Sequence, residues 1–446
     1  MRAGTFSSLR NRNFRLYTIG QIVSQSGTWM QTVAFGWLVL ELSDSGTAVG
    51  LVTALQYVPV LLFAPWAGVV ADRFDKRRLL TFTQALAGSQ ALLLGVVTAT
   101  GAVELWMVYL AAALFGLITA FDNPTRQSFV MEMVGPTEVT NAVTLNSVTM
   151  NAARVVGPGG AGAILALVGT APCFLFNAAS YGAVIVALVA MDGSRLHRAP
   201  PVARAPRQLR EGLRYVTTVP DLAVTLAMMT VIGAFAYEFQ VILPIAAKYT
   251  FGGEAGTYAL MTGAMGAGAV VGGLVTAGRP RTGLDVLGRT AMTFGAAIAL
   301  VAISPTLPVA IAALLVTGSA SVTFVSRANA TVQLAAGPVM RGRVMALWTV
   351  SVIGTTPVGG PVIGWIGEHI GARWGLGVGA ASAVGMGLWG RWQARRRAGV
   401  APAAAVLAGA GTPPPAPPVE LVVEPPTDGP GLPPGAPAPA PAPGTA

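Results

Sequence analysis

Twelve apolar stretches separated by short connections are the feature that most constrains this chain of 446 residues. Each stretch has about the twenty residues that a helix needs to cross ~30 Å of hydrocarbon at 1.5 Å per residue. The apolar fraction of 53%, the charged fraction of 10% and the mean hydropathy of +0.63 agree, because a soluble chain needs more charge to cover its surface. The sequence therefore predicts an all-α integral membrane protein. The predicted spans are 17–40, 47–67, 79–99, 103–121, 142–169, 171–191, 222–247, 256–278, 288–305, 307–326, 344–366 and 371–392.

The basic residues are concentrated in alternate connections between these spans. All but three of the 28 lysines and arginines lie near the ends of the chain or near the connections that follow an even-numbered span. The exceptions are Lys248, Arg373 and Arg154, and Arg154 lies inside a span. The positive-inside rule then puts both termini in the cytoplasm, and we expect a bacterial cytoplasmic membrane. The net charge of +10 is thus a topology signal that suits an anionic lipid leaflet, and nucleic acid is not an expected partner.

The two halves of the chain resemble each other across a polar connection. Gly135-Pro136 stands between the fourth and fifth spans, and Gly337-Pro338 has the same place in the second half. Downstream, the Gly-Pro-Gly-Gly run at 157–160 has a counterpart in the Gly-Gly-Pro run at 359–361. Parallel six-span halves around a central site are typical of one large transporter class. The predicted parts are an N-terminal half at 1–191, a cytoplasmic linker at 192–221, a C-terminal half at 222–397 and a disordered Pro/Ala-rich cytoplasmic tail at 398–446.

The connection after the second span carries the most specific motif. It reads GVVADRFDKRRL from Gly68 to Leu79, and it resembles the G-x-L-A-D-R-x-G-R-R-x-L signature of the major facilitator superfamily. Val70 and Asp75 depart from that signature. The ADRFD form is similar to the branch of bacterial enterobactin exporters and of macrolide and drug efflux proteins. Over about 1–395, the resemblance implies twelve transmembrane helices arranged as two six-helix pseudo-symmetric halves.

The same resemblance implies a gate at the cytoplasmic ends of the helices. Glycine lets two helices approach closely, and a carboxylate at a helix end accepts hydrogen bonds from a neighbouring helix or a guanidinium. Arg126 follows the fourth span on the same face as Asp72, so we expect these two to pair. The alternative for the basic run at 76–78 is that it only anchors the topology, and Asp122-Asn123-Pro124 is typical of a helix-ending turn. The predicted gate residues are Gly68, Asp72, Arg73, Arg77 and Arg126.

Two ionisable residues inside predicted spans are candidates for coupling. Glu238 is the acid that we place well inside a membrane segment, where burial disfavours the charged form of a carboxylate. A proton-coupled antiporter needs such a group, although a hydrated and passive position near the outer mouth is the alternative. A guanidinium such as Arg154 costs ~2.5–3.5 kcal/mol at membrane depth. We expect Arg154 to face the cavity, where it would tune the proton carrier or bind an anionic substrate, or else to reach towards the cytoplasm.

The fifth span resembles the G-P-x-x-G-G element of family exporters, with Ala161 in place of the first paired glycine. Proline and glycine there predict a bend and tight packing, and the residues concerned are Gly157, Pro158 and Gly162. Other polar and aromatic residues within spans are candidates for substrate contact, with helix packing or lipid contact as the alternative. These possible cavity residues are Gln25, Trp29, Gln31 and Asn151.

The sequence favours no metal or cofactor chemistry. Cys173 is the only cysteine, so metal or redox sites of the CxxC type are excluded, and His197 and His369 are the only histidines. A Walker sequence for ATP is absent as well. We therefore predict a protein that is not an enzyme, has no cofactor and uses the proton gradient as its energy source.

These observations predict a secondary transporter that works by alternating access. Its expected activity is the proton-coupled export of a small lipophilic or siderophore-like molecule, by a monomer in the lipid bilayer. The alternatives are uptake of a small nutrient and a non-transporting membrane sensor or assembly partner. A dense set of polar and charged residues in the cavity would favour uptake of a sugar or ion, and a large soluble domain would favour a sensor; the sequence predicts neither feature.

Overall fold

The computed structural model describes residues 6–135, 138–197, 208–277, 282–337 and 340–409, and the side chains of a few further residues inside helices lie outside this description. The regular elements in these ranges are all helices, as predicted. The first half contains α1 (Arg12–Ser43), α2 (Gly46–Arg73), α3 (Lys76–Ala99), α4 (Leu105–Val134), α5 (Val139–Val168) and α6 (Ala171–Val189). The second half contains α7 (Gln208–Thr218), α8 (Pro220–Ala236), α9 (Phe239–Ile245), α10 (Ala255–Ala277), α11 (Leu284–Ile303), α12 (Leu307–Ala335), α13 (Arg341–Ile353), α14 (Thr356–His369) and α15 (Ala372–Gly409). Short helical turns lie at Ser7–Arg10, Gly193–Arg195 and Ala246–Thr250.

Three of the first helices begin at residues whose side chains cap them. The side chain of Asn11 accepts from two backbone N–H groups at the start of α1, and that of Ser45 accepts from Ala48 N at the start of α2. Asp75 accepts from the backbone N–H of Arg78 at 3.0 Å and caps α3. A carboxylate at this position is favourable because it satisfies a free N–H at the positive end of the helix. Asp75 therefore has a structural reason to replace the glycine of the family signature.

Nine helical segments among the described residues are long and apolar enough to cross a membrane. Two of them combine consecutive helices, α8 with α9 and α13 with α14. The helices α1, α5 and α15 have similar or greater length but are not among the nine. A multi-pass membrane protein is therefore supported, and the count of twelve spans stays a prediction.

Several predicted helix ends differ from the structure. The sequence Asp122-Asn123-Pro124 does not end α4, which continues through Pro124 to Val134. The predicted seventh span is interrupted between α8 and α9, and the predicted eleventh span is divided between α13 and α14. The helix α15 also continues through 398–409, where we expected disorder, and this stretch is rich in alanine, the strongest helix former. The remainder of the predicted tail, 410–446, lies outside the described residues.

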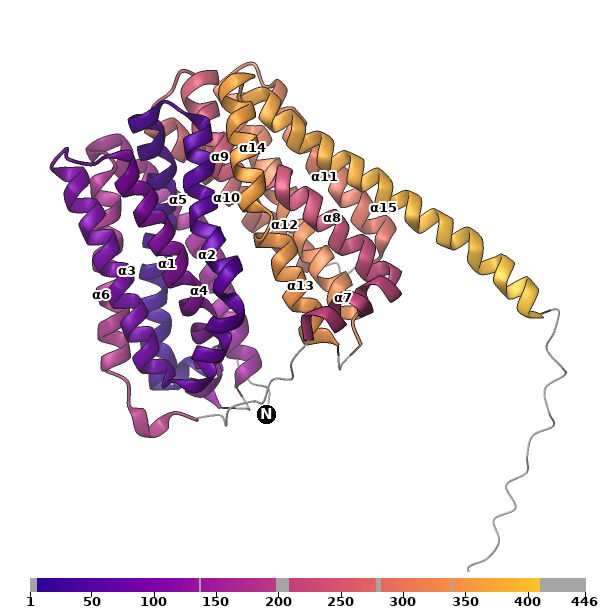
Figure 1. Cartoon of the computed structure of the whole chain (residues 1–446), viewed down its shortest axis with the longest axis horizontal. Coiled ribbons are helices and arrows are strands. Elements are labelled where there is room, and N and C mark those ends of the chain that lie inside the picture. The colour runs from indigo at the N-terminus through magenta and orange to yellow at the C-terminus, as the bar shows by residue number, and fades with distance from the viewer. Residues whose placement is uncertain (1–5, 136–137, 198–207, 278–281, 338–339, 410–446) are drawn as a thin grey trace, which may run out of the picture. The chain divides into compact units, whose positions relative to one another are not determined.

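The helices of residues 6–396 run between two ends, which we name after one residue at each. The Asp44 end is where α1 ends and α2 begins, and the Asp72 end is where α2 ends and α3 begins. In Figure 1, α1 to α6 gather on one side, while α8 and α11 to α13 gather on the other. The two halves are in contact mainly along two helix pairs, α2 with α14 and α5 with α10.

Candidate functional site

The α2–α14 pair brings the two halves together through glycines. A Cβ atom on Gly50 would collide with the backbone of Gly360 and Pro361, and one on Gly46 would collide with the Gly364 carbonyl. Both glycine pairs are nearer the Asp44 end than the Asp72 end. Side chains larger than hydrogen would hold these two helix backbones apart, so the glycines set how closely the halves approach.

Polar bonds between the halves accompany this contact at the Asp44 end. One carboxylate oxygen of Glu368, on α14, accepts from Ser45 Oγ at 2.8 Å, Thr47 N at 2.9 Å and Thr47 Oγ1 at 2.6 Å. Lys248 forms an ion pair with Asp44, and the Tyr249 hydroxyl donates to the Asp44 carbonyl at 2.9 Å. The Lys248 ammonium donates to the Asp44 carboxylate and holds the pKa of Asp44 below its ordinary value. These bonds hold the halves together at this end of the bundle.

Glu238 lies at the interruption between α8 and α9, where its backbone has φ −81° and ψ 38°. It is 3% exposed, so the alternative of a hydrated position does not describe this structure. Its surroundings are mainly apolar and include Phe239, Ile298 and Leu376. The Thr356 hydroxyl donates to the carboxylate, whereas Oε1 is a buried atom with no hydrogen-bond partner in the described part of the chain.

The Glu238 carboxylate is also next to the contact between the halves. A Cβ atom on Gly360 would lie 3.1 Å from Gly50 O and 3.6 Å from Glu238 Oε2. Thr356, which donates to the same carboxylate, stands at the start of α14. A change in the charge of Glu238 would therefore act directly on the helix that meets α2.

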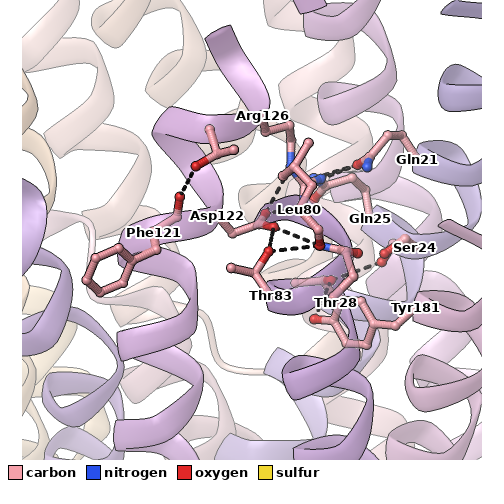
Figure 2. Close-up of polar contacts among 12 residues, drawn as sticks. Gln21, Ser24, Gln25, Thr28, Leu80, Thr83, Phe121, Asp122, Arg126 and Tyr181 are labelled. Carbon is pink, nitrogen blue, oxygen red and sulfur yellow. Dashed lines mark hydrogen bonds and ion pairs between the residues drawn. The ribbon is translucent and has the colours of Figure 1, made fainter. Parts of the chain in front are cut away.

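A buried ion pair lies in the first half, within α4. Arg126 donates through Nε to Asp122 Oδ2 at 3.0 Å and through Nη2 to the same oxygen, and Nη1 donates to Gln21 on α1 (Figure 2). Asp122 Oδ1 accepts from Thr83 Oγ1 and from Gln84 Nε2, each at 2.8 Å. Asp122 and Arg126 are 5% and 8% exposed. The network joins α1, α3 and α4 around one carboxylate.

This arrangement differs from the predicted gate. Arg126 forms an ion pair with Asp122, four residues earlier on the same helix, rather than with the expected Asp72. The physical reason is that α4 continues past Pro124, so residues 122 and 126 stand one turn apart on one helix face. Gly68 is buried, Asp72 is half-buried and Arg73 is exposed near the end of α2. The role of these three in gating stays a prediction.

The basic run after α2 has specific partners. Arg77 donates through Nε to Leu188 O at 2.7 Å and through Nη2 to Val189 O at 2.8 Å. Lys76 pairs with Glu132 of α4 at 2.6 Å, and both side chains are nearly buried. Cations near the last carbonyls of a helix are favourable, so Arg77 caps the end of α6. In this structure, Lys76 and Arg77 thus do more than mark the topology.

The predicted exporter element on α5 takes part in packing at two interfaces. A Cβ on Gly157 would meet Trp29 and the Ser26 carbonyl of α1, and one on Gly162 would meet Ala259 of α10 in the other half. Pro158 is buried inside the helix. The side chains of Asn151 and Arg154 lie outside the described residues, so their predicted roles stay open.

The predicted cavity residues Gln25, Gln31 and Trp29 lie in different surroundings. Gln25 lines a small cavity between α1, α3, α4 and α6. Gln31 is 0% exposed, donates to Gln90 Oε1 at 3.4 Å and accepts from Asn177 Nδ2 at 2.8 Å, so it joins helices within the first half. Trp29 packs beside Gly157.

Sequence reasoning missed the partners of Asp122 and Arg126. Thr83, Gln84 and Gln21 bond to this pair from neighbouring helices. The signal that points to the pair is the i, i+4 spacing of an acid and an arginine, which has meaning only once α4 is extended. No group of three His, Cys, Asp or Glu side chains within the described ranges gathers as a metal site would.

Comparisons with known proteins agree with this architecture. The sequence pattern of a family of transmembrane secretion effectors matches residues 3–425. The staphyloferrin A transporter of Staphylococcus aureus is 25% identical over 250 residues, which are 56% of this chain and 63% of that protein. The multidrug efflux pump Tap of Mycobacterium tuberculosis is 27% identical over 377 residues, which are 79% of this chain and 88% of that protein.

The fold has matches among solved structures as well. A POT family transporter crystallised with 5-aminolevulinic acid matches with a TM-score of 0.71 at 10% sequence identity, over 86% of this chain and 96% of that one. At such low identity the match speaks for the fold alone. Together with the family match over most of the sequence, it confirms the predicted resemblance and the class of protein. The chain therefore belongs to the transmembrane secretion effector family of the major facilitator superfamily, a family of multi-pass membrane transporters rather than of enzymes.

Proposed function

We propose that this transporter exports a small lipophilic or siderophore-like molecule from a bacterial cytoplasm in exchange for protons. The names of its relatives support this direction, because one transports staphyloferrin A and another is a multidrug efflux pump. The distribution of arginine and lysine supports a cytoplasmic position for both termini and for the Asp72 end. The Asp44 end would then face outward.

The observation that carries the proposal is the position of Glu238. It is a buried carboxylate, one oxygen of which has no hydrogen-bond partner among the described residues, and it lies beside the Gly50–Gly360 contact between the halves. Protonation removes a charge from an apolar environment, whereas deprotonation requires water or a counter-charge. The two protonation states would thus favour different separations of α2 and α14.

An exchange cycle follows from this coupling. The bonds at the Asp44 end hold that side closed, so this state would receive a molecule from the cytoplasmic side. Opening of the Asp44 end would expose Glu238 to protons from outside, and reclosure would carry the proton inward. One charge that moves through 100 mV supplies about 2.3 kcal/mol. In this scheme Glu238 is the proton carrier, and Arg154 keeps its predicted role of tuning the carrier or binding an anionic group.

The test is export by efflux-deficient cells that express the chain, with a panel of fluorescent dyes, macrolides and siderophores. We expect lower accumulation with the wild-type chain, a return to control levels with a protonophore, and loss of export in Glu238→Gln. The matched control is Glu254→Gln, because Glu254 is an exposed acid of the same half, and it should export normally. Export that persists in Glu238→Gln would remove Glu238 as the carrier. If cells that express the wild-type chain accumulate every compound of the panel to the same level as cells without it, export of these compounds is rejected.

A further inference from the structure

A second polar site lies inside the first half, away from α8 and α9. It is the cavity between α1, α3, α4 and α6, which we call the N-half chamber, lined by Gln25, Thr28, Gln84, Asp122, Arg126 and Tyr181. Figure 2 shows Gln25, Thr28 and Tyr181 facing the ion pair of Asp122 and Arg126. Asn123, which also borders it, is exposed.

The ion pair in the chamber is electrically neutral and its carboxylate is saturated. Asp122 accepts four hydrogen bonds, two on each oxygen, from Thr83, Gln84 and Arg126. A carboxylate has about four lone-pair positions, so no acceptor capacity remains there. An anionic ligand would meet the Asp122 charge, and a cationic ligand would meet the Arg126 charge. The chamber therefore favours an uncharged group.

One buried acceptor in the chamber lacks a donor. Gln84 is 2% exposed, its Nε2 donates to Asp122 Oδ1, and its Oε1 has no hydrogen-bond partner within the described residues. A buried carbonyl oxygen without a donor is unfavourable, and native structures satisfy such groups with protein, water or ligand. Gln84 Oε1 could therefore accept a hydrogen bond from an O–H or N–H group.

The space in the chamber limits what that group can be attached to. The cavity has a volume of ≈ 70 Å³. Sites that enclose a whole drug-sized ligand are several times larger. The chamber therefore suits one substituent of a larger molecule.

We propose that the N-half chamber binds a neutral hydrogen-bond-donating substituent, a hydroxyl or an amide N–H, of the transported molecule, with Gln84 Oε1 as its acceptor. The proposal rests on the proposed function for the direction of transport, and it narrows the substrate class to molecules that carry such a substituent. The same molecule without the donor would bind more weakly.

The test uses two probes that differ in one hydroxyl group, Nile red and 2-hydroxy Nile red. Fluorescence titrations of the purified full chain in lipid nanodiscs, corrected with empty nanodiscs, give the two dissociation constants without any proton gradient. We expect the hydroxylated probe to bind about fivefold more tightly to the wild-type chain, as one net hydrogen bond would give. In Gln84→Met this preference should disappear.

Gln90→Met is the matched control. Gln90 is a buried glutamine on the same helix, but it does not line the chamber. Its Nε2 is also a buried atom that has no hydrogen-bond partner in the part of the chain that the structure describes. The preference should persist in this variant. A preference that survives Gln84→Met, or that both variants lose equally, overturns the assignment, as does equal or absent binding of the two probes by the wild-type chain.

A measurement on the wild-type chain alone protects the test against variants that do not fold. Cyclohexanol should displace 2-hydroxy Nile red at lower concentration than methoxycyclohexane, which has no donor, and equal displacement contradicts the proposal. Because binding is measured without a gradient, its outcome is separate from that of the export assay. A chain that shows the preference but exports nothing would reject the proposed function and retain the chamber.

Discussion

The ion pair of Asp122 and Arg126 shows what a buried charge requires in this bundle. Each member is nearly inaccessible, and the carboxylate has donors from α3 and α4. Removing one partner of such a pair leaves the other charge buried and unpaired, which is more costly than losing the pair as a whole. The pair should therefore be sensitive to single substitutions and tolerant of a coordinated change.

We expect Asp122→Asn to lower the free energy of unfolding by about 3 to 5 kcal/mol, because it leaves the Arg126 guanidinium uncompensated. The measurement is reversible denaturation of the purified chain in detergent. Arg289→Gln serves as control, since Arg289 pairs with Asp285 at the same spacing and its side chain is 66% exposed, where about 0 to 1 kcal/mol is expected. The double change of Asp122→Asn and Arg126→Gln should recover part of the loss; a loss as large as that of the single change would contradict a pairing effect.

The sequence indicated some of these residues and not others. Glu238 was predictable because an acid stands alone in an apolar stretch, and it is buried. Asp122 was not, because the Asp-Asn-Pro run predicts a turn. Within α4, Pro124 removes one backbone bond, the one that an N–H at this position would donate to Ala120 O. Packing against neighbouring helices lets membrane helices tolerate such a proline, and no local pattern reveals that packing.

At the scale of whole helices, the beginnings of α1, α2 and α3 are more predictable than the end of α6. Asn11, Ser45 and Asp75 are side-chain caps with recognisable sequence. The end of α6 depends instead on Arg77, which comes from α3. A cap that a distant helix supplies has no signal in the neighbouring sequence.

Replacing Arg77 with glutamine should lower the free energy of unfolding by about 1 kcal/mol, because the last carbonyls of α6 lose a cationic donor. Arg77→Lys should recover only part, since lysine keeps the charge but not the two-pronged geometry of the guanidinium. Arg78→Gln is the comparison, as that side chain is exposed, and it should be neutral within error. The same denaturation measurement checks all three, and equal effects at positions 77 and 78 would argue against capping.

At the scale of the whole molecule, glycine contacts decide how the halves meet. Gly50→Ala places a methyl group against the Gly360 backbone. Overpacking of this kind costs about 1 to 3 kcal/mol, which would lower the equilibrium constant for closure of the Asp44 end by about 5- to 150-fold. Spin labels on Ala102→Cys and Thr306→Cys, in a Cys173→Ala background, report the separation of the halves at that end. Gly182→Ala should leave the distances unchanged, because a Cβ there meets open space.

The same labels test the pH dependence of the Asp44 end. Lys248 lowers the pKa of Asp44, so the ion pair stabilises the closed form above the ordinary aspartate pKa of about 3.9. This contribution is lost as the pH falls through the lower pKa of the paired state. We expect longer label distances below about pH 4 in the wild-type chain and a weaker pH response in Asp44→Asn. Asp192→Asn, at the other end, should respond like the wild type, although hydrogen bonds from Ser194 also lower the pKa of Asp192.

The Gly50–Gly360 contact has a mechanical consequence, because it lies close to the beginning of the long helix α2. From Gly50 to the end of α2 at Arg73 the helix extends about 35 Å. A tilt of about 15° around a fulcrum at the glycines would move that far tip by about 9 Å. The crossing point itself would shift only slightly. Leverage of this kind would turn a small movement of α2 beside Glu238 into a much larger one at the Asp72 end.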